Sequence, residues 1–194
     1  KHISEILSVL SDGGVIALPM GSSWAFCCDA TSKKAIKAMY NLKPEHPKKR
    51  PFAMVCNDIS MASTMTNIGG GSYSLLRKLL PGAYTVILKS ARNLPKLMKD
   101  KREKVGIRIP NEPITLSIIE RYDKPLAATS VPRGRGGELL QMGYQIYEEF
   151  GHAVSIVVDL GLELPATEST ILDCSGDDIE LIRQGAGPTD ILGL

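Results

Sequence analysis

The sequence Gly-Gly-Val-Ile-Ala-Leu-Pro at residues 13–19 marks a change from helix to strand. Apolar residues precede it at helical spacing, namely Ile3, Ile6, Leu7 and Leu10. The two glycines end that pattern, because glycine commonly follows the last turn of a helix. The apolar run that follows, residues 15–18, is short enough for a buried strand and stops at Pro19. This stretch therefore predicts a helix that leads into a buried strand.

The same two periodicities predict the elements farther along the chain. Helical spacing or a capping residue predicts helices at residues 31–42, 58–65, 73–80, 113–122 and 138–150, with Thr31 and Asp58 as N-caps. Short apolar or β-branched runs predict strands at residues 52–56, 84–88, 105–109, 126–130, 155–159, 169–173 and 179–183. The glycines at residues 69–71 are expected to break the chain. Because helices and strands interleave but three strands follow one another at the end, the pattern predicts an α/β fold with a mixed sheet and flanking helices.

The length and composition fit one globular domain. The chain has 194 residues, 43% of them hydrophobic and 23% charged, and we expect a single domain over residues 1–194. No run approaches the roughly 18 apolar residues of a membrane-spanning helix, and residues 1–11 do not resemble a signal peptide. The four cysteines lack the spacing of a metal site: Cys27, Cys28, Cys56 and Cys174. Reduced thiols and a cytoplasmic location are therefore expected.

Charge is distributed unevenly along the chain. Residues 1–135 hold 22 lysines and arginines and 10 aspartates and glutamates, a net charge of +12. Residues 136–194 hold 1 and 11, a net charge of −10. If the two parts lie on opposite sides of the fold, one face attracts polyanions and the other repels them. The alternative is that solvated helix faces merely differ in sign.

Two loops could bind an anionic ligand. The turn at residues 19–24 places Ser22 after a strand's carboxyl end, where α/β sheets bind ligands; the alternative is an ordinary loop with Trp24 packed on the core. Residues 43–51 crowd four basic side chains and His46 into a loop that contains three prolines. Proline lowers the entropy cost of presenting those charges, which favours a phosphate-bearing partner over a merely solvated loop.

Three further segments place polar residues near strand ends. Arg108 stands in an apolar strand between two isoleucines, so it either faces solvent, covers an edge or holds an anion. Thr129 and Ser130 end a strand of small residues and precede the Arg- and Gly-rich residues 133–137, whose backbone amides could approach a phosphate. Arg183 ends the last strand beside glycines. No one of these segments identifies a ligand by itself.

The sequence disfavours covalent catalysis and metalloenzyme chemistry. It contains no Gly-x-Ser-x-Gly or His-Glu-x-x-His motif and no Cys/His ligand set, and its three histidines are His2, His46 and His152. The chemistry that remains is catalysis by binding and orienting the ligand. Cations and hydroxyls arranged around a phosphorylated ligand can catalyse transfer at phosphorus without an enzyme nucleophile.

Taken in order along nearly the whole chain, a set of short motifs resembles the YrdC/YciO family. The motifs are Gly13-Gly14-Val15-Ile16 leading to Pro19, Cys28-Asp29-Ala30, Leu42-Lys43, Pro81-Gly82-Ala83-Tyr84-Thr85, Arg108-Ile109-Pro110, Pro125-Leu126-Ala127-Ala128-Thr129-Ser130, Ser169-Thr170-Ile171-Leu172-Asp173 and Arg183-Gln184-Gly185-Ala186. Synthases of this family make threonylcarbamoyl-adenylate from ATP, L-threonine and bicarbonate for tRNA modification. The resemblance implies a twisted mixed sheet around a concave, basic cleft that binds nucleotide. It also implies ATP as a substrate with Mg²⁺ as its companion ion, and tRNA or double-stranded RNA as a partner.

The resemblance assigns roles residue by residue. Lys43 would neutralise ATP phosphates, Arg108 would hold the threonine carboxylate or a phosphate, and Ser130 would hydrogen-bond the adenylate. Further nucleotide or substrate contacts are implied for Ser22, Thr129, Ser169 and Arg183, and Arg50 is expected to bind the nucleotide as well. Attack of a threonine carbamate on the α-phosphate gathers several negative charges, so cations and donors must be in place beforehand.

The chain departs from the synthase pattern at five positions: Met20, Gly21, Glu45, Val55 and Pro132. Glu45, or His46 if one residue is inserted, replaces the arginine of the family's Lys-x-Arg motif. Reversing this charge beside a triphosphate weakens binding, unless Lys49 or Arg50 moves in to compensate. Pro132 removes the amide donors of an asparagine. These departures place the sequence nearer the YciO branch than the housekeeping synthases.

Two hypotheses from different classes follow. The first is a protein that binds ATP or an adenylate and has weak or altered threonylcarbamoyl-adenylate synthase activity. The second is a non-catalytic RNA-binding protein that uses the same positive surface. The sequence favours the first, because Arg108, Thr129 and Ser130 are features of buried strands, whereas RNA binding needs only surface charge and no aromatic stacking cluster is evident.

Overall fold

The computed structural model describes residues 2–47, 50–92, 94, 98 and 103–192. The helices are α1 (His2–Ser11), α2 (Lys33–Leu42), α3 (Ile59–Ser63), α4 (Gly70–Leu79), α5 (Pro113–Tyr122), α6 (Gly143–Phe150) and the short 3₁₀ helix η2 (Asp190–Leu192). The strands are β1 (Ile16–Pro19), β2 (Trp24–Asp29), β3 (Ala53–Val55), β4 (Tyr84–Lys89), β5 (Lys104–Arg108), β6 (Leu126–Ser130), β7 (Ile156–Val157), β8 (Thr170–Asp173) and β9 (Glu180–Arg183).

The strands of the described residues form one nine-stranded sheet in the order β7-β1-β2-β6-β3-β5-β4-β8-β9. The pairs β1/β7, β3/β5 and β4/β8 are parallel. The pairs β1/β2, β2/β6, β3/β6, β4/β5 and β8/β9 are antiparallel. The prediction of an α/β fold with a mixed sheet and flanking helices is therefore confirmed.

Side-chain alternation along the strands divides the core between the two faces of the sheet. Met54 in β3 and Ile107 in β5 belong to a core on one face, here called the first face, to which α2, α3, α4 and α6 also contribute. Val55, the neighbour of Met54, belongs to a separate core on the opposite or second face, formed with α1 and α5. Successive residues of a strand point to opposite faces, so β1, β2, β3 and β6 each supply both cores.

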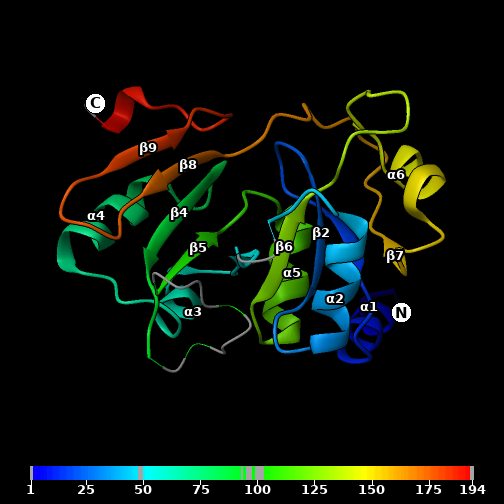
Figure 1. The fold of residues 1–194 in the computed structure, drawn as a ribbon, viewed down its shortest axis with the longest axis horizontal. Helices are drawn as coiled ribbons and strands as arrows, with labels where there is room; N and C mark the ends of the chain where they lie inside the picture. Colours follow the sequence, from blue (N-terminus) through cyan, green and yellow to red (C-terminus); the bar gives the residue numbers. More distant parts are fainter. Residues whose placement is uncertain (1, 48–49, 93, 95–97, 99–102, 193–194) are drawn as a thin grey trace.

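Helices cover the second face only in part. In Figure 1, α1 and α5 lie against the part of the sheet that holds β2 and β6, while α4 lies beside β4 and β8. The second core accordingly takes residues from β1, β2 and β6, and only Val55 from the strands beyond them. Among the described residues, no helix covers the second face of β5, β4 and β8. This half of the face is where a ligand could reach the sheet.

Local hydrogen bonds explain where two helices begin. Ser32 caps α2, since its Oγ accepts a bond from the Ala35 N–H at 3.2 Å. The prediction of Thr31 as this N-cap is wrong, because Thr31 donates from its N–H and its hydroxyl to Asp29 Oδ1, each at 2.6 Å. Asp58 caps α3 as predicted, accepting an N–H of the first turn at 2.7 Å.

Three elements depart most from the sequence prediction. Strand β2 was not predicted, because all six of its residues are buried and no alternation marks them as a strand. Helix α6 begins at Gly143 rather than at residue 138. Just before Gly143, the N–H groups of Gln141 and Met142 each donate to Gln145 Oε1 at 2.9 Å. Helix α4 begins at Gly70, inside the glycine triplet that was expected to break the chain.

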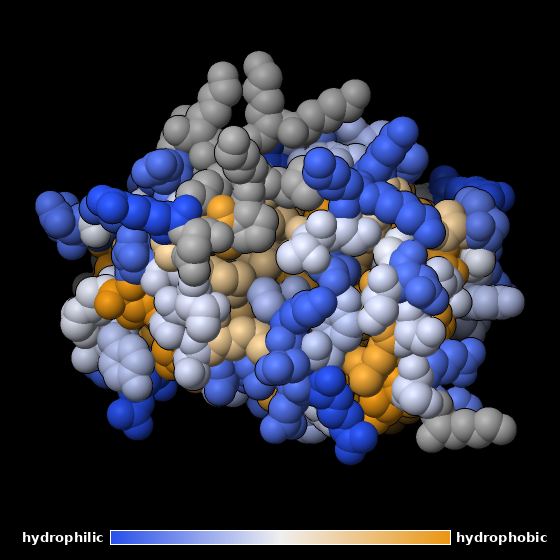
Figure 2. Space-filling view, turned by 90° about the horizontal axis from the view of Figure 1, so that it is seen from below, coloured by the Kyte–Doolittle hydropathy of each residue, from blue (hydrophilic) through white to orange (hydrophobic). Residues whose placement is uncertain are grey.

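The lower side of the molecule in Figure 1 carries only small hydrophobic areas on its surface. Figure 2 shows this side covered mostly by hydrophilic residues, with hydrophobic ones in separate patches. Within the described part of the chain, no helix combines the length and apolar character needed to cross a bilayer.

Candidate functional site

The uncovered half of the second face forms the floor of a cleft of about 800 Å³. Small residues leave room on this floor: Ala53 in β3, Gly106 in β5 and Ala128 in β6. A Cβ atom at Gly106 would come within 3.3 Å of the Thr85 methyl group, so a larger residue there would crowd the floor. Small-molecule sites span about 300–1,000 Å³, so the cleft can accommodate a nucleotide.

Charged side chains gather around the cleft. The cations among the described lining residues are Lys43, Arg50, Lys104, Arg108 and Arg183, and the carboxylates are Glu45, Glu168 and Asp173. Lys104 and Asp173 pair with each other, with 2.8 Å between Nζ and Oδ2. The four other cations face two carboxylates, which leaves the rest of the lining with an excess of positive charge that attracts anions.

Lys43 follows the last turn of α2 and reaches the end of β6. Its Nζ donates to the Ser130 Oγ at 2.6 Å and to the Ser130 carbonyl at 2.8 Å. Glu45 Oε1 lies 4.0 Å away, and the Lys43 side chain is 15% exposed. Burial lowers the pKa of Lys43, the carboxylates of Glu45 and Glu168 oppose this shift, and Arg183 adds to it. The ammonium is thus oriented by Ser130, with one N–H left for an anion.

Arg108 ends β5 on the strand face that lines the cleft. Its Nη2 donates to the Met20 carbonyl at 3.2 Å and to the Ser22 Oγ at 3.3 Å, and the residue is 8% exposed. Among the described residues, no carboxylate lies within 4.0 Å of it and its Nε has no hydrogen-bond partner. Burial lowers the pKa of Arg108 to about 10, so the group stays charged at neutral pH. A buried guanidinium of this kind is suited to a carboxylate or phosphate ligand.

Arg183 ends β9 and is held by the segment that leads into β8. Its Nη1 donates to Glu168 Oε2 at 2.8 Å, and its Nε and Nη2 donate to the Ser169 carbonyl at 3.2 and 2.8 Å. Ser169 is 5% exposed, and its Oγ lies 2.9 Å from the Thr85 hydroxyl. These bonds fix the guanidinium at the edge of the cleft.

Thr129 and Ser130 occupy the end of β6, where the strand meets the cleft. They pair with Phe26 and Ala25 of β2, which holds their backbones in the middle of the sheet. Both are half-buried and line the cleft. Ser130 shares its strand face with Ala128 of the second core, so its hydroxyl is placed on a rigid element facing the cleft. Thr129 shares its strand face with Ala127 of the first core, so its side chain does not lie on the cleft floor.

The loop after α2 is held in place by His46. Its Nε2 lies 2.8 Å from the Arg50 carbonyl, and its ring centroid lies 4.4 Å from that of Phe52. Burial lowers the pKa of His46, and the bond to the Arg50 carbonyl opposes this shift. These contacts give His46 a structural role. The Arg50 side chain lines the cleft, whereas Lys48 and Lys49 lie outside the described residues.

The turn between β1 and β2 accepts hydrogen bonds from the Arg108 guanidinium. Ser22 lies in this turn and contacts the cleft only through its bond to Arg108. Gly21 has φ +81°, and a Cβ atom there would lie 3.1 Å from the Asn111 carbonyl, so glycine suits this turn better than the aspartate of the synthase pattern. Met20 is buried and lines the cleft.

The structure brings the predicted site residues together. Seven of them line the one cleft: Lys43, Arg50, Arg108, Thr129, Ser130, Ser169 and Arg183. Ser22 joins this group through Arg108. The residues come from segments far apart in the sequence, so their convergence is a property of the fold. Their roles toward a ligand stay predictions.

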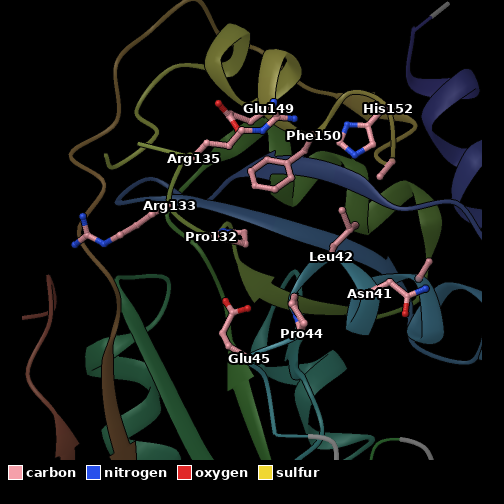
Figure 3. A pocket seen from close by; sticks show the side chains of 12 residues that line it. Asn41, Leu42, Pro44, Glu45, Pro132, Arg133, Arg135, Glu149, Phe150 and His152 are labelled. Atoms are coloured by element: carbon pink, nitrogen blue, oxygen red, sulfur yellow. The ribbon is translucent and has the colours of Figure 1, made fainter. Parts of the chain in front are cut away.

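Two departures from the synthase pattern lie at a second pocket, of about 520 Å³, beside the cleft. Figure 3 shows this second pocket between the end of α2, the segment after β6 and the end of α6. Pro132 lines the second pocket, and Glu45 lines both the second pocket and the cleft. A third departure, Val55, is fully buried and is part of the cleft lining. The changes at Glu45 and Pro132 therefore alter the boundary between two cavities.

Sequence reasoning missed the acidic residues of the cleft. Glu168 and Asp173 come from the negative part of the chain, residues 136–194, yet they line the same cleft as Lys43. Residues of the positive and negative parts of the chain therefore meet at this cleft. Strand alternation could have identified Lys104, because it shares a strand face with Arg108.

The described residues do not fit a resident metal ion. No three His, Cys, Asp or Glu side chains gather there as a metal site. The Mg²⁺ that the resemblance implied therefore has no set of protein ligands within the described part of the chain.

Comparison with known proteins identifies the family. A family model named for Sua5, YciO and YrdC and described as "Telomere recombination" matches residues 8–185. The chain belongs to this Sua5/YciO/YrdC family. The predicted YrdC/YciO resemblance is thus confirmed.

Individual relatives agree with this assignment. YciO of Escherichia coli (strain K12), an uncharacterized protein, is 27% identical over 189 residues, which cover 96% of this chain and 90% of YciO. The crystal structure of E. coli YciO matches with a TM-score of 0.88 and 25% identity over 97% of this chain and 91% of that one. The prediction of a YrdC-like fold nearer the YciO branch is therefore confirmed.

Other family members carry names that state an activity or a ligand. The threonylcarbamoyl-AMP synthase of Bacillus subtilis (strain 168) is 26% identical over 186 residues, which cover 95% of this chain and 53% of that protein. The structure of P. abyssi Sua5 complexed with L-threonine matches with a TM-score of 0.86 and 22% identity, over 98% of this chain and 56% of that one. At that identity the Sua5 structure shows a shared fold.

Proposed function

We propose that this protein binds ATP and L-threonine in the cleft and forms threonylcarbamoyl-adenylate, more slowly than a synthase with the complete Lys-x-Arg motif. The observation that carries the proposal is the convergence of Lys43, Arg108 and Arg183 on one cleft. A relative named threonylcarbamoyl-AMP synthase and the L-threonine complex of P. abyssi Sua5 support this choice of substrates. Bicarbonate would supply the carbamate carbon.

The reaction demands the arrangement of charge that the cleft offers. A carbamate oxygen of N-carboxylated threonine forms a bond to the α-phosphorus of ATP, the bond from that phosphorus to the oxygen shared with the β-phosphate breaks, and pyrophosphate leaves. Nucleophile and leaving group are both negative, so cations fixed beforehand lower the barrier most. Lys43 and Arg183 are fixed in this way by Ser130 and Ser169. They would contact the phosphates.

The remaining site residues would position the two substrates. Arg108, buried and without a described carboxylate partner, would hold the threonine carboxylate, with Ser22 orienting its guanidinium. Ser130 would hydrogen-bond the adenylate, and Arg50 would supply a cation on the loop that lacks the motif arginine. Mg²⁺ would enter as part of the ATP substrate.

The proposal is tested by incubating the protein with ATP, labelled bicarbonate and threonine, and following pyrophosphate and the labelled adenylate. Pyrophosphate release should require threonine and bicarbonate together, and Lys43→Ala should abolish it. Lys37→Ala is the matched control, because Lys37 is exposed on α2, the helix that Lys43 follows, and does not line the cleft. Turnover that Lys43→Ala leaves unchanged contradicts the site. No turnover, with salt-sensitive binding of double-stranded RNA or tRNA, favours the RNA-binding alternative.

A further inference from the structure

Glu45 brings a negative charge to the end of the cleft where Lys43 lies. Its Oε1 is 4.0 Å from the Lys43 Nζ, and its side chain is 58% exposed. It lines both the cleft and the second pocket. In Figure 3 the carboxylate points into the space below Pro132. An anion bound to Lys43 would therefore meet the Glu45 carboxylate.

The backbone keeps Glu45 at this place. The His46 N–H donates to the Lys43 carbonyl at 3.0 Å, which closes a turn with Pro44 and Glu45 at its centre. Proline at the second position favours such a turn. The contacts of the His46 ring with Phe52 and the Arg50 carbonyl fix the far side of the loop. The turn therefore keeps the backbone of Glu45 beside Lys43, while its carboxylate can rotate.

The charges around the cleft match a ligand with few negative charges. Apart from the Lys104–Asp173 pair, the described lining carries four cations, and the two carboxylates Glu45 and Glu168 oppose them, which leaves a net charge of +2. Glu168 is already engaged with Arg183 at 2.8 Å. A nucleoside monophosphate carries about two negative charges at neutral pH, whereas a triphosphate carries about two more. The extra charges of a triphosphate would meet the Glu45 carboxylate without a further described cation to balance them.

We propose that Glu45 makes the cleft discriminate adenine nucleotides by charge, so that an adenylate with one phosphate is favoured relative to ATP. This inference rests on the proposed binding of a nucleotide in the cleft. It accounts for a slow synthase, because ATP is the substrate and an adenylate is the product. Glu45 acts through repulsion, and its effect should grow with each phosphate placed beside Lys43.

The test compares the dissociation constants of AMP and ATP by calorimetric titration in magnesium-free buffer at low salt. Glu45→Gln should tighten ATP binding by about 3- to 30-fold, and AMP binding by less than about 3-fold. Glu45→Asp keeps the charge and should retain the wild-type ratio of the two constants. Glu120→Gln is the matched control, since Glu120 is exposed on α5 and does not line the cleft, and it should change neither constant. Added salt should shrink the effect of Glu45→Gln.

The outcomes separate this inference from the proposed function. Charge discrimination is overturned, while nucleotide binding stands, if Glu45→Gln leaves the ratio of the AMP and ATP dissociation constants unchanged. It is also overturned if Glu45→Asp changes this ratio as much as Glu45→Gln does. Absence of any AMP or ATP binding to the wild-type protein, or AMP binding that Lys43→Ala does not weaken, overturns the proposed function and this inference with it. Thermal denaturation of each variant shows whether it is folded.

Discussion

The Lys43 ammonium donates to both the hydroxyl and the carbonyl of Ser130, a residue 87 positions farther along the chain. The shorter of the two bonds, 2.6 Å to the hydroxyl, joins a charged donor to a side chain at the end of β6. Bonds of this kind are stronger and more directional than neutral ones. Helix α2 and strand β6 thus orient the ammonium before a ligand arrives.

Replacing Ser130 should loosen this orientation without removing the charge. In Ser130→Ala only the carbonyl still accepts from Lys43, so we expect ATP to bind about 3- to 10-fold more weakly. Calorimetric titration measures the change, and Ser60→Ala, an exposed serine of α3, is the control. Equal affinities in the two variants would show that the Ser130 hydroxyl does not prepare Lys43.

Replacing Arg108 should weaken threonine binding without lowering the free energy of unfolding. The guanidinium is buried without a described carboxylate partner, so methionine at this position removes a desolvated charge and keeps most of the packing. We expect Arg108→Met to leave the free energy of unfolding unchanged or to raise it by about 1 kcal/mol. Threonine binding should fall by about 10-fold or more.

Urea denaturation and threonine titration check both parts of this prediction. Ile107→Ala is the comparison, because Ile107 is fully buried in the core of the first face, and its loss should lower the free energy of unfolding by about 2–5 kcal/mol. Arg108→Met that binds threonine as tightly as the wild type would remove Arg108 from the site.

Asp29 should make the fold sensitive to acid. Its carboxylate accepts from the hydroxyls of Thr31 and Tyr122 at 2.6 and 2.5 Å. Burial alone would raise the pKa of Asp29, but these hydrogen bonds and the charge of Lys124 hold it below its ordinary value. Because the folded pKa lies below the unfolded one, the stabilisation is present above about pH 4 and is lost as the pH falls through the folded pKa.

We therefore expect Asp29→Asn to lower the free energy of unfolding by about 1–3 kcal/mol at pH 7. The difference from the wild type should shrink as the pH falls through the folded pKa of Asp29, below which both side chains are neutral. Urea denaturation across this range measures it. A difference that stays constant from pH 7 to the acid limit would mean that the charge of Asp29 does not stabilise the fold.

The affinity for ATP should fall at high pH. Burial lowers the pKa of Lys43, and the Glu45 carboxylate partly reverses this shift. ATP binding needs the protonated ammonium, so it should weaken as the pH rises through the pKa of Lys43, and in Glu45→Gln it should begin to weaken at a lower pH. Lys43→Arg, which stays charged, should lack this decline over the same range. Identical pH profiles for Lys43→Arg and the wild type would assign the decline to another group.

Most elements of the fold could be predicted from local patterns. Helix α5 and strand β6 follow the predicted bounds to the residue, because a proline begins the first and small apolar residues form the second. Strand β2 could not be predicted by alternation, since both of its faces are buried in the middle of the sheet. The start of α6 depends on the capping contacts of Gln145, which periodicity does not register.

The site could be predicted only as separate pieces. Alternation placed Arg108 on the face opposite Ile107, and both neighbours of Arg108 do lie in the core of the first face. The acidic members needed tertiary information: Asp173 reaches Lys104 because β8 pairs with β4 in parallel and β4 pairs with β5. Pairings between strands so far apart in the sequence leave no local signal, which is why Asp173 and Glu168 were missed.

The central claim, that Lys43 and Arg183 meet the same nucleotide phosphates, is tested most directly by titrating ATP into the wild type, Lys43→Ala, Arg183→Ala and the double variant. Each single variant should weaken binding by about 10- to 100-fold, and the double variant by less than the product of the two, because both side chains would contact one ligand. Lys37→Ala should bind as the wild type does. Affinity for ATP that survives both single substitutions unchanged would contradict the account.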